Sequence, residues 1–174
     1  GYFAIVLSYP ESGALWQPGT GNEQIVEPGD LALNMDVWSG SGEYGYEYGI
    51  VLQNDFGKTK GTVCYLPNWN LYDSNLAPSA RLSTPGSISG VLSGGSCIPG
   101  AAEVVYSASL GTENGYPIHV IEVKVPRTAI GNPQEGYVNH VLLSLNCAND
   151  IIQLDTRWDP NNDIPEFTTL TAGL

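Results

Sequence analysis

Acidic and amide side chains near the end of the chain have the spacing of a calcium-binding loop. Hard cations prefer oxygen ligands at alternate positions, and the residues in the first, third and fifth positions here are Asp159, Asn161 and Asp163. A standard calcium loop would then need Gly and Glu at positions where this chain has Ile164 and Leu170. The spacing therefore predicts at most a looser calcium site, completed by Asp150 or Asp155, and the alternative is a solvated acidic turn.

Aromatic residues beside amides and carboxylates are typical of carbohydrate-binding sites, because flat rings stack on the apolar faces of sugars. The segment 67–73 has this chemistry and reads P-N-W-N-L-Y-D. The candidate sugar-binding residues are Trp38, Tyr44, Trp69 and Tyr72, with Trp16 as a further ring. The alternative is that these rings fill the edges of a hydrophobic core, since each can bury a large apolar area.

Catalytic signatures are lacking in the sequence. It contains no G-x-S-x-G elbow, no H-E-x-x-H pair and no glycine-rich phosphate loop. The two histidines, His119 and His140, fall in predicted strands and would face one another if those strands formed a hairpin. Carboxylates are plentiful, but no spacing marks an acid–base pair. We therefore predict that the protein is not an enzyme.

Three cysteines allow one disulfide and leave one thiol. None lies in a C-x-x-C motif, so zinc and thioredoxin-type chemistry are not indicated. We predict a disulfide between Cys64 and Cys97, which flank a long loop-like region; closing it would contribute about 3–4 kcal/mol. Cys147 would then either be a buried free thiol or form a disulfide with another chain.

Composition narrows the class of protein. The chain has 174 residues, with 6 basic and 18 acidic side chains and a net charge of −12. This charge repels nucleic-acid phosphates and anionic lipids, so we predict no nucleic-acid partner. No segment is apolar over the roughly 18 residues that a membrane helix needs. Its 21 Gly and 12 Pro, interspersed with apolar runs, favour an all-β protein with many turns.

The stretch from Tyr116 to Asp155 contains the clearest strands. Residues 118–125 and 138–145 are rich in β-branched and aliphatic side chains and are separated by a turn with glycine and proline. We predict that they pair with each other in the middle of a sheet. Residues 126–130 form the one short helix that we expect.

Other strands follow from shorter patterns. The prediction places them at 2–8, read as a buried strand, and at 31–38, 44–53, 62–66, 87–92, 101–110 and 151–154. In 44–53 the tyrosines at 44, 46 and 48 share one face and glycines lie on the other, which lets a backbone or ligand approach closely. One domain would span 1–157, and 158–174 would form a tail or linker.

Short blocks along the chain resemble a group of secreted proteins that carry a C-terminal sorting signal. The blocks are F-A-I-V (3–6), G-D-L-A-L (29–33), Y-E-Y-G-I (46–50), V-K-V-P-R (123–127) and N-C-A-N-D-I-I (146–152). That group is similar to β-sandwich domains of the DOMON and family-nine carbohydrate-binding type. The resemblance implies an antiparallel, jelly-roll-like β-sandwich with long loops. Some DOMON-type domains bind haem through Met and His, so the resemblance also raises the hypothesis of a haem site. In this chain the ligands would be Met35 and either His119 or His140.

The tail resembles a second family. I-P-E-F-T-T, residues 164–169, looks like the start of an archaeal PEF-type sorting signal, which in that family precedes a membrane segment and basic residues. Processing or truncation would explain why the segment is missing after Leu174. The resemblance implies an archaeal, extracellular cell-surface protein.

Two functions are consistent with these features. The first is a structural envelope protein, a sheath, surface-layer or filament subunit, that self-associates through strand edges into a homopolymer. Its first strand, which has no residues before it, and the odd Cys147 would make contacts between subunits. The alternative is a carbohydrate-binding module that uses Trp69 and neighbouring residues to bind a polysaccharide. We predict no cofactor for either function, and calcium is the one alternative.

Overall fold

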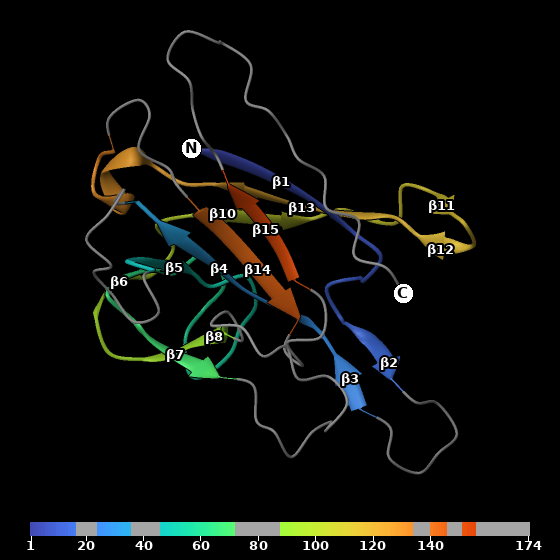
Figure 1. The fold of residues 1–174 in the computed structure, drawn as a ribbon, viewed down its shortest axis with the longest axis horizontal. Coiled ribbons are helices and arrows are strands. Elements are labelled where there is room, and N and C mark those ends of the chain that lie inside the picture. Colours follow the sequence, from blue (N-terminus) through green and yellow to red (C-terminus); the bar gives the residue numbers. More distant parts are fainter. Residues whose placement is uncertain (17–23, 36–45, 72–87, 134–139, 146–150, 156–174) are drawn as a thin grey trace, which may run out of the picture.

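The protein is an all-β molecule built from antiparallel strands. The structure, a computed structural model, describes residues 1–16, 24–35, 46–71, 88–133, 140–145 and 151–155 (Figure 1). The helical segment among these residues is the single 3-10 turn η2 (Arg127–Ile130), which Pro126 precedes. The short helix predicted at 126–130 is therefore confirmed, one residue shorter.

A three-stranded sheet forms one layer. Strands β1 (Tyr2–Leu7), β13 (His119–Lys124) and β10 (Glu103–Tyr106) lie side by side in the order β1-β13-β10, along the long axis of the molecule (Figure 1). Residues of β13 alternate between buried and more exposed positions, as expected for a sheet with one face in the core.

A six-stranded sheet forms the second layer. Its order is β15-β14-β4-β5-β6-β9, and all neighbours are antiparallel. The strands are β4 (Pro28–Asn34), β5 (Tyr48–Ile50), β6 (Val63–Tyr65), β9 (Ser96–Ile98), β14 (His140–Leu145) and β15 (Ile151–Asp155).

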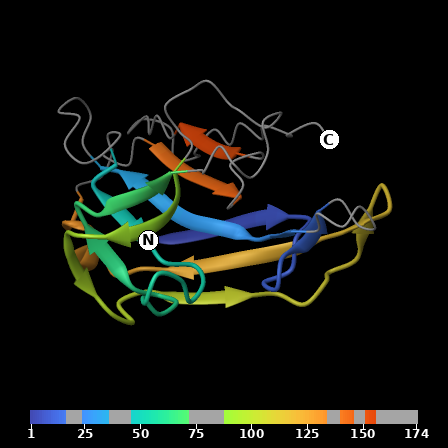
Figure 2. The same cartoon turned by 90° about the horizontal axis from the view of Figure 1, so that it is seen from below.

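Between the two sheets lies the main core. It consists of Ile5, Leu31, Leu33, Ile50, Leu52, Val63, Ala102, Val104, Ile121, Val123, Val125 and Ile130. These apolar side chains come from both sheets and from η2 at one end, which is the arrangement of a β-sandwich. Figure 2 shows the same layers from below. The predicted all-β antiparallel sandwich is confirmed.

A second core lies on the opposite face of the six-stranded sheet. Strands β7 (Asn68–Leu71) and β8 (Ile88–Ser93) pair with each other and cover this face. The buried side chains between them and the sheet are Ala32, Tyr46, Val51, Cys64, Trp69 and Val91. Strand β4 is consequently buried on both faces, which agrees with the unbroken apolar run Leu31–Ala32–Leu33 at its centre.

Two small pairs of strands complete the described fold. β2 (Ala14–Trp16) pairs with β3 (Gln24–Val26), and β11 (Thr112–Glu113) pairs with β12 (Tyr116–Pro117). The first pair lies between residues 9 and 30, where no strand was predicted.

The predicted hairpin between residues 118–125 and 138–145 is wrong. Both strands exist and both are inner strands, but β13 pairs with β1 and β10 while β14 pairs with β4 and β15. His119 therefore lies opposite Leu7, and His140 lies opposite Asn34 and Asp155. After β13 the chain passes through η2 rather than a tight turn, so the two strands join different layers.

The long strand predicted at 44–53 is shorter in the structure. Strand β5 contains only Tyr48–Ile50, and the predicted tyrosine face does not form. Tyr46 packs in the second core, whereas Tyr48 packs against the main core and the ring of Tyr65. Before Tyr48 the buried Glu47 accepts the backbone N–H of Met35 on its carboxylate at 2.7 Å, so regular alternation is interrupted there.

Candidate functional site

The outer edge of β1 is an accessible pairing surface of the sandwich. Among the described residues no strand pairs with that side of β1. The strand carries no charged side chain, and Tyr2 and Val6 are 79% and 63% exposed. Protein sheets usually protect such edges with charge, proline, a bulge or a covering segment, because an open edge recruits another strand.

The backbone of β1 presents its free hydrogen-bonding groups at three positions. Gly1 and Val125 exchange both backbone bonds, with the Gly1 amino group donating at 2.7 Å and the Val125 N–H donating at 3.0 Å. Backbone groups alternate along a strand, so those of Phe3, Ile5 and Leu7 also point toward β13. The groups of Tyr2, Ala4 and Val6 consequently point away from the sheet.

The opposite edge of the same sheet is better protected. Strand β10 has four residues, and Glu103 places a charge on it. The backbone N–H of Ala102, just before β10, donates to Gly61 O at 2.9 Å, so a loop covers the beginning of this edge. Gly61 makes this approach possible, because a Cβ atom there would lie 2.2 Å from Ala102 O.

Trp69, the central residue of the predicted sugar site, is buried. Its side chain is 4% exposed and packs edge-to-face against Tyr46, with 6.5 Å between ring centroids. A sugar cannot stack on a ring in this position, so the ring fills the second core instead. The other predicted sugar-binding residues, Trp38, Tyr44 and Tyr72, lie outside the described residues, and carbohydrate binding stays a prediction.

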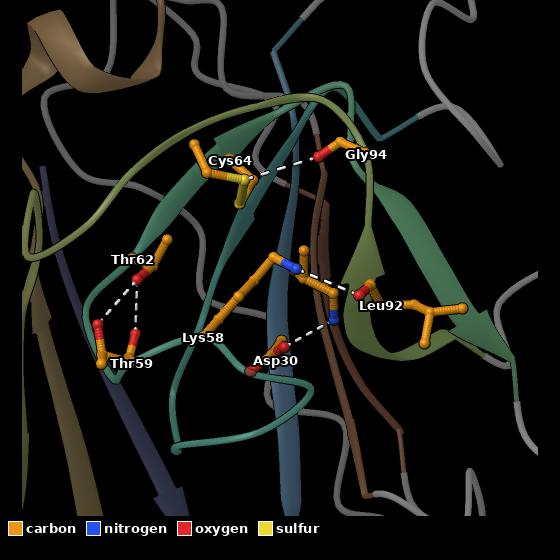
Figure 3. The surroundings of a disulfide bond; sticks show 9 residues. Asp30, Lys58, Thr59, Thr62, Cys64, Leu92 and Gly94 are labelled. Carbon is orange, nitrogen blue, oxygen red and sulfur yellow. Dashed lines mark hydrogen bonds between the residues drawn. A yellow bond between two sulfur atoms is a disulfide. The ribbon is translucent and has the colours of Figure 1, made fainter.

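A buried carboxylate connects three segments around the second core. Asp30 accepts the N–H of Leu52 on Oδ1 at 2.9 Å. Its Oδ2 accepts the N–H of Val91 at 2.7 Å (Figure 3). Burial raises the pKa of Asp30 to about 6, and the two backbone hydrogen bonds oppose this rise. Asp30 therefore fixes β8 to the six-stranded sheet, and we assign it a structural role.

The disulfide predicted between Cys64 and Cys97 is confirmed. It joins β6 to β9, where the two cysteines are opposite one another (Figure 3). A structural disulfide is compatible with an oxidising, extracellular environment. Cys147 lies outside the described residues. The part of the chain that the structure describes also contains no helix long and apolar enough to span a membrane.

The metal and haem hypotheses remain predictions. Asp159, Asn161 and Asp163 lie outside the described residues, as does Asp150. Within the described ranges no group of three or more His, Cys, Asp or Glu side chains is placed to hold a metal. For haem, Met35 packs at the margin of the main core, and His119 is buried with Nδ1 at 3.3 Å from Ser107 O.

No protein-family model matches this chain, and comparisons with curated proteins and with solved structures also found no match. The resemblances to sorted surface proteins and to DOMON-type domains thus stay predictions.

The exposed face of β1 and the buried Asp30 were not predicted from the sequence. The segment 2–8 was predicted as a buried strand, which is correct only for one face, because Tyr2, Ala4 and Val6 are exposed. Both faces of this strand are apolar, so alternation could not reveal the exposed one. Asp30 was not among the predicted site residues; an acid directly preceding an apolar strand was the available signal.

Proposed function

We propose that this chain is a secreted structural protein of the cell surface, without enzymatic activity, whose copies assemble through the edges of their β-sheets. The assembly would be a sheath, surface layer or filament. The observation that supports it is the edge of β1, which is six residues long, uncharged and open among the described residues. Short segments with high β-propensity, low charge and no proline are those that add to other strands.

The location is part of the same proposal. The disulfide suits a protein that folds outside the cytoplasm. The PEF-like hexapeptide at 164–169 would act as a sorting signal that delivers an archaeal protein to the cell surface. Detection of the protein in a cell-envelope fraction, with a processed C-terminus by mass spectrometry, would agree with this location; a cytoplasmic, unprocessed protein would contradict it.

Electron microscopy tests the assembly directly. We expect ordered filaments, tubes or lattices from the wild-type protein and dispersed particles from Ala4→Lys, which places a charge on the open edge. The matched control is Leu110→Lys, because Leu110 is 66% exposed but lies outside the sheets. Dispersed wild-type particles at every concentration would contradict the proposal.

Salt dependence separates strand pairing from ionic assembly. Every copy carries a net charge of −12, so copies repel one another at low ionic strength. Salt screens such repulsion beyond about 8 Å at 0.15 M. Light scattering should therefore show more assembly at physiological salt than at low salt, and the opposite trend would indicate that ion pairs hold the copies together.

A further inference from the structure

The open edge of β1 is complementary to itself. Its outward-pointing backbone groups belong to residues 2, 4 and 6, which are spaced evenly about Ala4. If a second copy is rotated by a two-fold axis at this position, Ala4 faces Ala4 and Tyr2 faces Val6 of the second copy. Each facing pair exchanges two hydrogen bonds, so the three pairs make about six.

Side chains on both faces of β1 fit this register. On the exposed face the small Ala4 lies at the centre, and the Tyr2 ring would cover Val6 of the second copy on either side. On the core side Phe3 is only half buried at the margin of the main core, and Ile5 of the second copy would lie beside it. Aromatic and β-branched neighbours across strands are stabilising, by about 0.2–1 kcal/mol a pair relative to alanine.

Charge also favours a second copy at this position. Two chains of net charge −12 can approach most easily where no acid is present, and β1 has none. The nearest charged side chains on the exposed face are Glu122 and Lys124, one strand away on β13 and opposite Ala4 and Tyr2. No like charges would face one another across the contact.

The edge of β10 is a poorer partner for β1. Ser107 N–H donates to Val120 O on β13 at 2.8 Å, so alternation points the backbone groups of Val104 and Tyr106 outward. The N–H of Ala102, the next outward position, is already bonded to Gly61. Pairing of β1 with β10 would therefore form fewer hydrogen bonds than pairing of β1 with itself.

We infer that two copies of this chain pair through β1 in antiparallel register about Ala4, which joins two three-stranded sheets into one continuous six-stranded sheet. The inference rests on the proposed function and specifies its first contact. A two-fold contact closes on itself and yields a dimer. Longer assemblies would then require a second contact at another edge.

Disulfide trapping tests the register. In a Cys147→Ser background, Ala4→Cys should form a covalent dimer under mild oxidation, because facing residues of such a pair have Cα atoms about 5.5 Å apart, within the range for disulfides. Tyr2→Cys and Val6→Cys should each stay uncrosslinked alone but crosslink when mixed. Crosslinking of Tyr2→Cys with itself would overturn the register.

Proline substitution tests the strand contact in solution. Ala4→Pro removes an N–H that points away from the sheet, a position where edge strands tolerate proline. We expect the dimer dissociation constant, measured by light scattering, to rise about tenfold or more while the melting temperature stays close to wild type. Phe3→Pro removes an N–H that points toward β13 and should lower the melting temperature instead. An unchanged dissociation constant in Ala4→Pro would overturn the inference.

The two proposals can fail separately. If microscopy shows assemblies but Ala4→Cys does not crosslink, the two-fold pairing is wrong and the structural function stands. If the wild-type protein remains monomeric and no assemblies form, both are wrong.

Discussion

The two faces of the six-stranded sheet are built from different side chains. Toward the main core the sheet presents aliphatic residues of similar kind, among them Leu31, Leu33 and Ile50. Toward β7 and β8 it presents small residues and one buried acid, including Gly49, Cys64 and Asp30. The first face is held by general hydrophobic burial. The second depends on individual residues: Gly49 allows close packing, Cys64 forms a disulfide, and Asp30 accepts backbone hydrogen bonds.

Removing volume from the aliphatic face should have the largest effect. Leu33 is fully buried, so Leu33→Ala should lower the free energy of unfolding by about 2–5 kcal/mol through lost burial and the remaining cavity. Denaturant titration measures this change. Val105→Ala is the control, because Val105 is 46% exposed and should change the free energy by no more than about 0.5 kcal/mol. Equal losses in both variants would mean that the main core is misassigned.

On the second face the crosslink should have the next largest effect. The disulfide closes a loop with a sequence separation of 33 residues, and its loss should reduce the free energy of unfolding by about 3–4 kcal/mol. The comparison is between Cys64→Ser/Cys97→Ser and Cys147→Ser, both studied by denaturation without reductant. A Cys147→Ser variant as unstable as the double variant would show that the pairing is not the one described.

The two faces also differ in how well the sequence predicts them. The aliphatic face follows from alternation in the predicted strand 31–38, which places Leu31 and Leu33 on one side. The disulfide followed from the position of two cysteines on either side of a loop. The strand pairing of β13 and β14 could not be predicted from the sequence. Alternation shows which face of each strand is buried but not which strand lies beside it. The position of Trp69 did not follow either, because a ring flanked by asparagines has the same sequence pattern whether it stacks on a sugar or fills a core.

Because Asp30 lies on the second face, the stability of that face should depend on pH, whereas the described residues of the aliphatic face toward the main core include no group that titrates in this way. Its pKa is about 6 in the folded protein against an ordinary value of 3.8, so the folded state binds the proton more tightly than the unfolded chain. The contribution of Asp30 to the free energy of unfolding should therefore be greatest below about pH 4, decline as the pH rises to about 6 and then level off, a loss of about 3 kcal/mol in total.

Asp30→Asn provides the control for this pH dependence. The amide oxygen can accept one of the two backbone N–H groups, but the amide nitrogen cannot accept the other, so the variant should be less stable at acidic pH. Its free energy of unfolding should no longer decline between pH 4 and 6. A decline of the same size in Asp30→Asn would assign the pH dependence to another group.

Adding one methyl group at Gly49, on the face toward β7 and β8, should have the smallest of these effects. A Cβ atom at Gly49 would lie 2.6 Å from Val91 Cγ2 and 2.9 Å from Trp69 Cη2, closer than side chains normally approach. Gly49→Ala should therefore lower the free energy of unfolding by about 1–3 kcal/mol, because β8 and the indole ring must move. The double variant Gly49→Ala/Val91→Ala should lose less than the sum of the two single variants, since the second change makes room for the first. Additive losses would mean that Gly49 is required for its backbone conformation and that Val91 and Trp69 do not rest on it.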